Sequence, residues 1–121
     1  MRSLQTIVRR HRTSVLGVQQ RVHPRYHVPS DTRGAIRSPR GDFCIPARLL
    51  NLSLGGAGLL LDEPSPIGEL LHVEFSRTEP DFTCTMLLRV VHCTEQPDGR
   101  FLVGGRFEDE LEPSELRMLI F

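Results

Sequence analysis

The stretch "FTCTMLLRVV", residues 82–91, has the alternation that is typical of a β-strand with one buried face. Five side chains fall on one face of such a strand: Phe82, Cys84, Met86, Leu88 and Val90. Thr83, Thr85 and Arg89 fall on the other face. Because successive side chains of a strand point to opposite sides of a sheet, we expect the first set to enter a core and the second to meet solvent.

The runs on either side of this stretch have the same period. In "GELLHVEFS", residues 68–76, the inward set is Leu71, Val73 and Phe75. In "RFLVGGRFE", residues 100–108, the inward set is Phe101, Val103, Gly105 and Phe107. The intervening "PDG", residues 97–99, predicts a hairpin turn. Three neighbouring strands of this kind indicate an antiparallel sheet.

Earlier in the chain, "GAGLLL" (56–61) predicts a short strand, and "SPRGD" (38–42) predicts a turn. In "FCIPARLLN" (43–51), one face carries Phe43, Ile45, Ala47 and Leu49. Pro46 falls on the other face and indicates a strand edge or a bulge. Short alternating strands separated by turns predict an all-β fold with flanking helices: a small antiparallel barrel of about six strands, closed so that it has no free edges.

The last ten residues, "EPSELRMLIF", change to a helical period. Pro113 suits the first helical position, and Glu115 favours the positive end of the helix. Leu116, Leu119 and Ile120 form an apolar stripe. We therefore expect a C-terminal helix that covers an open end of the barrel.

The charge of the chain is unevenly distributed, although its net charge is zero. Residues 1–40 carry nine arginines and one acid, Asp31, whereas the remainder carries six arginines and fourteen acids. Residues 3–19 have apolar side chains at roughly helical spacing. We divide the chain into a basic, partly helical N-terminal arm (1–20) and a barrel domain (21–121), and the basic arm predicts an anionic partner.

Catalysis and metal binding find little support in the sequence. The five histidines are scattered, and Ser53 has no GxSxG setting, so we predict no catalytic residue, no metal site and no cofactor. Cys44, Cys84 and Cys93 form no CxxC pair, which is typical of a protein in the reducing cytoplasm. No apolar run approaches the ~18 residues that span a bilayer, and no secretory signal is visible, so we expect no membrane span.

Two stretches remain, "RVHPR" (21–25) and "NLSLGGAG" (51–58). Each stretch alone is weak evidence for a function, because an arginine pair is common in a basic arm and the second stretch reads as a turn. Their combination, RxxxR before the first strand and NxSxxG after the second, followed by barrel patterning, resembles the PilZ domain family. The resemblance covers the chain from about residue 21 to its end.

PilZ domains are small antiparallel barrels that bind the bacterial second messenger cyclic diguanylate (c-di-GMP). The resemblance implies that c-di-GMP is the ligand and that five residues bind it: Arg21, Arg25, Asn51, Ser53 and Gly56. It also implies a bacterial signalling receptor or adaptor, without enzymatic activity, that passes its signal to a downstream protein partner. Gln20 stands where many members have a further arginine, and Asn51 stands where aspartate is common.

Elementary chemistry gives the motif residues their expected roles. A guanidinium can meet N7 and O6 of guanine with two donors, stack on a base or neutralise a phosphate, which lysine cannot reproduce. Asn51 can hydrogen-bond a guanine edge, Ser53 a phosphate oxygen, and Gly56 permits close backbone approach. We further expect residues 10–25 to be mobile and to become ordered over the barrel when the ligand binds.

Two other classes of function agree with part of the sequence. The first is a PilZ-fold protein–protein interaction module that binds no nucleotide, which the presence of all five motif residues disfavours. The second is a nucleic-acid-binding barrel. Aromatic residues make up only 6% of the chain, and none lies among Arg9, Arg10 and Arg12 as a stacking platform would, so we predict no nucleic-acid partner.

Overall fold

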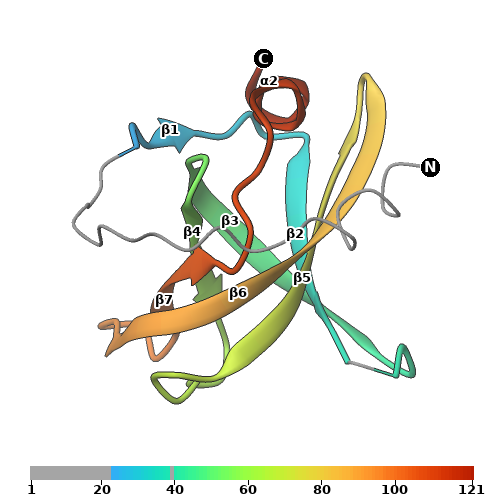
Figure 1. Cartoon of the computed structure of the whole chain (residues 1–121). Helices are drawn as coiled ribbons and strands as arrows, with labels where there is room; N and C mark the ends of the chain where they lie inside the picture. The colour runs from blue at the N-terminus through green and yellow to red at the C-terminus, as the bar shows by residue number, and fades with distance from the viewer. Residues whose placement is uncertain (1–22, 39) are drawn as a thin grey trace.

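The computed structural model describes residues 23–38 and 40–121; the expected arm, residues 1–20, lies outside them. The described elements are, in chain order, β1 (Tyr26–His27), β2 (Thr32–Arg37), β3 (Cys44–Leu52), β4 (Gly56–Leu61), β5 (Leu70–Thr78), β6 (Asp81–Glu95), β7 (Phe101–Phe107) and α2 (Pro113–Ile120). The strands form one antiparallel sheet in the order β1-β3-β2-β5-β6-β7-β4. An additional pairing of β3 with β4 closes β2 to β7 into a six-stranded barrel, and β1 adds to β3 at its margin (Figure 1). The predicted antiparallel barrel of about six strands is therefore confirmed.

The core follows the alternation from which the fold was predicted. Cys84, Met86, Leu88 and Val90 of β6 are almost fully buried, as are their counterparts on the neighbouring strands. The rings of Phe75 and Phe107 meet edge to face, with centroids 5.9 Å apart. Burial of these aliphatic and aromatic side chains is the main favourable term for the fold, about 1.5–3 kcal/mol for each large side chain.

One part of the predicted core is wrong. Phe43 and Ile45 are 53% and 51% exposed, whereas Ala47 and Leu49 on the same predicted face are buried. The reason lies in the pairing, because β4 joins β3 only from Arg48 onward. The first residues of β3 pair with β2 alone and extend beyond the barrel. Pro46 lies in this extension, where it is paired with Ala35, and the bulge of β3 falls later, between Leu49 and Asn51.

The predicted hairpin between β6 and β7 turns at Asp98 and Gly99, where Gly99 has a positive φ of 91°. The backbone N–H of Arg100 donates to Asp98 Oδ1 at 3.0 Å, and the guanidinium bonds Oδ2. These two donors hold the pKa of Asp98 below its usual value. The turn therefore contains an ion pair between Arg100 and Asp98.

The C-terminal helix lies at one end of the barrel, as predicted (Figure 1). Pro113 occupies the first turn, and the backbone N–H of Glu112 donates to Glu115 Oε1 at 2.8 Å, forming half of a capping box. Leu116 and Leu119 are buried. Within the described residues, no helix is long and apolar enough to cross a membrane.

The barrel also binds carbonyl oxygens at the end of α2. Thr32 Oγ1 donates to the carbonyl of Leu119 at 2.6 Å, and Arg77 Nη1 donates to that of Met118 at 3.1 Å. The last carbonyl groups of a helix have no partner within the helix, so these two donors supply what the helix itself cannot. They fix α2 to the start of β2 and to the end of β5.

Candidate functional site

The second motif forms the turn between β3 and β4. The Ser53 hydroxyl accepts hydrogen bonds from the backbone N–H groups of Gly55 (3.2 Å) and Gly56 (3.1 Å). It also lies 3.3 Å from the Gly56 carbonyl oxygen, to which it donates. Ser53 is only 7% exposed. These contacts show that Ser53 shapes the turn; its expected bond to a phosphate stays a prediction.

Gly56 is required because two strands approach closely. A Cβ at residue 56 would overlap the carbonyl oxygen of Gly105 on the paired strand β7. The glycines of this turn have no positive φ; in the described part of the chain, positive φ occurs at Gly41, Gly68 and Gly99. The physical requirement at residue 56 is space rather than a left-handed backbone.

The last residue of the first motif, Arg25, contacts the first residue of the second motif, Asn51. Arg25 directly precedes β1, in which Tyr26 and His27 pair with Leu52 and Asn51 of β3. Arg25 Nη1 donates to Asn51 Oδ1 at 3.1 Å, and the contact is exposed. The structure thus brings Arg25 and Asn51 together at the edge of the turn that Ser53 and Gly56 build. Arg21, the other predicted arginine, lies outside the described residues.

His23, which lies between the two motif arginines, was not singled out from the sequence. Its Nε2 lies 2.8 Å from Glu110 Oε2, and its ring lies 2.9 Å from the position that a Cβ on Gly55 would occupy. Glu110 is 87 residues away in the chain, so no local pattern could have revealed this contact. Contacts within the protein thus place His23 and the residues of β1, whereas the expected mobility of residues 10–25 stays a prediction.

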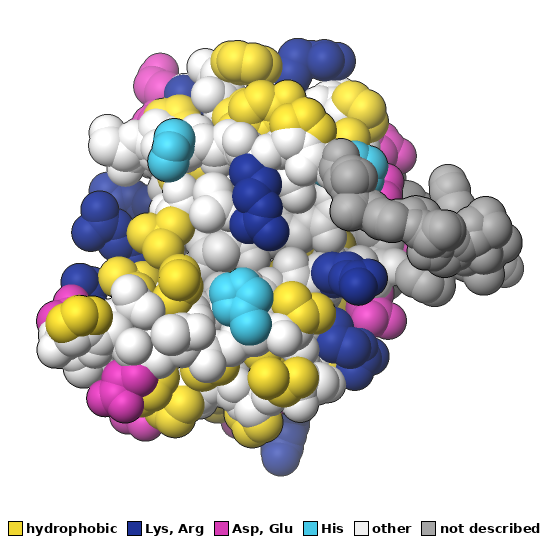
Figure 2. Space-filling view, turned by 90° about the vertical axis from the view of Figure 1, so that its left-hand side faces the viewer, with side chains coloured by type: hydrophobic (Ala, Val, Ile, Leu, Met, Phe, Trp, Pro, Cys, Tyr) yellow, Lys and Arg dark blue, Asp and Glu magenta, His cyan; other side chains and the backbone are white. Residues whose placement is uncertain are grey.

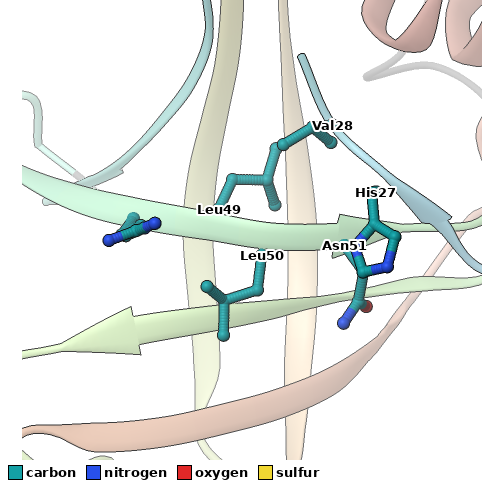
Figure 3. A pocket seen from close by; sticks show the side chains of 6 residues that line it. His27, Val28, Leu49, Leu50 and Asn51 are labelled. Carbon is teal, nitrogen blue, oxygen red and sulfur yellow. The ribbon is translucent and has the colours of Figure 1, made fainter. Parts of the chain in front are cut away.

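Next to the contact between Arg25 and Asn51, the wall of the barrel carries an open pocket of about 480 Å³. It is lined by His27, Val28, Arg48, Leu49, Leu50 and Asn51. Figure 3 shows His27 and Asn51 side by side at the point where β1 pairs with β3. The pocket combines an apolar floor with an amide, an imidazole and a guanidinium, which suits a ligand that has both planar rings and charge.

The outer face continues from Asn51 across β4 and β7 to β6. Asn51 is paired with Gly58, Gly58 with Gly104, and Gly104 with His92. The Asn51 side chain lies over Gly58, so a Cβ there would meet Asn51 Nδ2 at 3.0 Å. On the face drawn in Figure 2, basic side chains and histidines lie over the centre as well as near the edges, whereas acidic side chains lie toward the edges of the view. The middle of that face can therefore receive an anion.

Metal chemistry has no visible basis in the part of the chain that the structure describes. No group of three or more His, Cys, Asp or Glu side chains there has the geometry to hold a metal ion. Cys84 is buried in the core, as its place in the alternation predicts.

Comparison with known proteins gives a consistent result. The model of the PilZ domain matches residues 19–121. The flagellar brake protein YcgR of Thioalkalivibrio sulfidiphilus (strain HL-EbGR7) is 35% identical over 107 residues. That match covers 84% of this chain and 42% of the relative, so the chain spans less than half of that protein.

Solved structures share the fold. The PilZ domain of YcgR from Escherichia coli, solved with c-di-GMP, gives a TM-score of 0.59 at 19% identity, covering 84% of this chain and 86% of that one. The complex of MrkH from K. pneumonia with c-di-GMP gives a TM-score of 0.60 at 18% identity, covering 84% of this chain and 49% of that one. The barrel, its two adjoining motifs and the match over residues 19–121 agree: the chain belongs to the PilZ domain family.

Proposed function

We propose that the chain binds c-di-GMP on the outer wall of its barrel and acts as a signalling receptor, not as an enzyme, in the bacterial cytoplasm. The observation that carries the proposal is the contact between Arg25 and Asn51, which joins the two motifs at one place. Relatives add support, because PilZ structures of the same fold were solved with this nucleotide. The ligand carries two guanines and two phosphates, and the site offers groups suited to each.

Arg25 is the principal ligand-binding group in this proposal. Its guanidinium is exposed and bonds a neutral amide rather than a carboxylate, so it keeps its full charge for a phosphate and its other donors for O6 and N7 of a guanine. Arg21 would supply the second guanidinium. In the sequence, the two arginines flank His23, which the contact with Glu110 holds against the turn.

Asn51 and the turn complete the site. The Asn51 amide can donate to a guanine acceptor or accept from the N1–H and N2–H₂ edge, and its Oδ1 orients Arg25. Ser53 and Gly56 act mainly by holding the turn in the shape that presents Asn51. We propose that closure of the N-terminal arm over the occupied site changes the surface seen by a downstream protein.

Calorimetric titration of the full chain with four ligands tests the proposal: c-di-GMP, GMP, GTP and a single-stranded oligonucleotide. We expect saturable binding of c-di-GMP, and binding of the other three that is weaker by at least about tenfold, a difference of about 1.4 kcal/mol. Arg33→Ala is the matched control for Arg25→Ala, since Arg33 is an exposed arginine of β2 outside both motifs. Equal affinity for GMP would contradict the proposal, and no binding of c-di-GMP would favour the interaction module.

A further inference from the structure

His92 lies in an unusual position on the outer face of the barrel. It follows the irregularity in β6 between Val90 and His92, and it is paired with Gly104 of β7. A Cβ at residue 104 would overlap His92 Nε2 and lie 2.6 Å from Cε1 and 2.9 Å from Cδ2. Three atoms of the imidazole therefore occupy the space above Gly104 where a side chain would otherwise stand. The ring lies across the neighbouring strand instead of extending into solvent.

The ring also keeps an accessible surface. Gly104 is buried, whereas His92 is exposed. Among the residues that the structure describes, no hydrogen bond or ion pair engages the imidazole. One face of the ring thus rests on the backbone of β7, and, as far as the described residues go, the remainder is exposed. A planar group supported in this way is a suitable platform for stacking a base.

The His92 ring lies in the same row of paired residues as Asn51, which belongs to the proposed nucleotide site. Asn51, Gly58, Gly104 and His92 follow one another across β3, β4, β7 and β6 as successive pairs. From Asn51 to Gly104 the row crosses two strand spacings, about 10 Å. The Asn51 side chain lies over Gly58 and the His92 ring lies over Gly104, so the two groups cover neighbouring strands, and a flat ligand can lie across their outer surface.

Arg106 adds a charge beside this row. It is paired with Gly56, two residues along the strands from the Gly58–Gly104 pair, a distance of about 7 Å. It is exposed, and it makes no ion pair within the described residues. A base stacked on His92 would therefore have a guanidinium available nearby for the attached phosphate.

We propose that the His92 imidazole stacks against one guanine of c-di-GMP and so provides a contact outside both sequence motifs. This inference rests on the proposed function, since it assumes that the nucleotide binds beside Asn51. Stacking of a base on an aromatic ring predicts that removing the ring weakens binding by about 5- to 150-fold. It also predicts that another aromatic ring can replace the imidazole.

Four variants of the full chain, titrated with c-di-GMP, test the inference. We expect His92→Ala to weaken binding by about tenfold and His92→Phe to stay within about threefold of the wild type. His92→Lys, which keeps a cation without a ring, should bind as poorly as His92→Ala. Thr94→Ala is the matched control, because Thr94 is exposed on the same face of β6, two residues further along. In proton NMR, the His92 ring signals should move upfield on binding, and thermal melting should show that the variants stay folded.

The outcomes separate this inference from the proposed function. If the wild type binds and Arg25→Ala does not, but His92→Ala binds like the wild type, the stacking role is overturned and the proposed function stands. If His92→Lys binds normally while His92→Phe does not, charge rather than stacking is the contribution of His92, and the inference is again overturned. If the wild type does not bind c-di-GMP, both fail together.

Discussion

Arg25 donates a hydrogen bond from Nη1 to Oδ1 of Asn51 across 3.1 Å, although 26 residues separate them in the chain. The pairing of β1 with β3 makes this contact possible, because His27 lies opposite Asn51 and draws the preceding residues to the same edge. Two short motifs that are each uninformative alone therefore form one surface.

The first prediction concerns Arg25. Arg25→Ala should weaken c-di-GMP binding by at least about 30-fold, because a charged donor to phosphate or guanine is lost. Arg25→Lys should restore little of it, since an ammonium cannot make the bidentate contact. The free energy of unfolding should change by no more than about 0.5 kcal/mol, because the side chain is exposed. Titration and urea unfolding of the same preparations measure both quantities; normal affinity in Arg25→Ala would refute the site.

Two glycines that face the site should respond differently to the same substitution. Gly56→Ala places a methyl group on the Gly105 carbonyl oxygen, so it should lower the free energy of unfolding by about 2–3 kcal/mol. Gly58→Ala meets only the movable end of the Asn51 side chain, at 3.0 Å from Nδ2. It should weaken binding several-fold while the protein stays folded. Equal losses of stability in the two variants would show that the Asn51 side chain cannot move.

Ser53 should matter more for stability than for direct ligand contact. Ser53→Ala leaves the N–H groups of Gly55 and Gly56 without their acceptor, which should cost about 1–2 kcal/mol of unfolding free energy. Affinity for c-di-GMP should fall with the loss of turn geometry. Ser76→Ala on β5 is the matched control, a partly exposed strand serine. Unchanged stability combined with strongly reduced affinity would instead favour a direct bond from Ser53 to phosphate.

If the N-terminal arm closes when the ligand binds, amide hydrogen exchange should slow within a defined range of residues. Addition of c-di-GMP should slow exchange over residues 10–22, because ordering those residues requires the contacts that the ligand provides. Peptides that cover Tyr26 and His27 should change less, since these residues are paired with β3 within the protein. Exchange over residues 10–22 that is the same with and without nucleotide would remove the arm from the mechanism.

Much of the barrel could be predicted from periodicity. The alternation at residues 82–90 placed five side chains correctly in the core: the first three lie where β6 pairs with β5 alone, and Leu88 and Val90 lie where it pairs with β7. The same reasoning failed at Phe43 and Ile45, because alternation shows which residues share a face and not whether anything covers that face. The end of the β3–β4 pairing decides this, and it depends on a distant strand.

The candidate site was predictable only in part. Residue type and spacing identified Arg25, Asn51, Ser53 and Gly56, but they did not show that Ser53 would be buried in its own turn. His23 and His92 gave no local signal. Glu110 lies 87 residues from His23 in the chain, and the pairing of His92 with Gly104 depends on the register irregularity in β6 between Val90 and His92. Charge composition indicated an anionic ligand, but not the face that receives it.

The central claim is that c-di-GMP binds on the outer wall between Arg25, Asn51 and the neighbouring strands. Chemical-shift mapping of the ¹⁵N-labelled full chain during titration with c-di-GMP tests it most directly. The account predicts that the largest changes fall on residues 23–28, 51–58 and the backbone around Gly104. Changes concentrated instead on the exposed extension at Phe43 and Ile45, or an unchanged spectrum at saturating nucleotide, would contradict it.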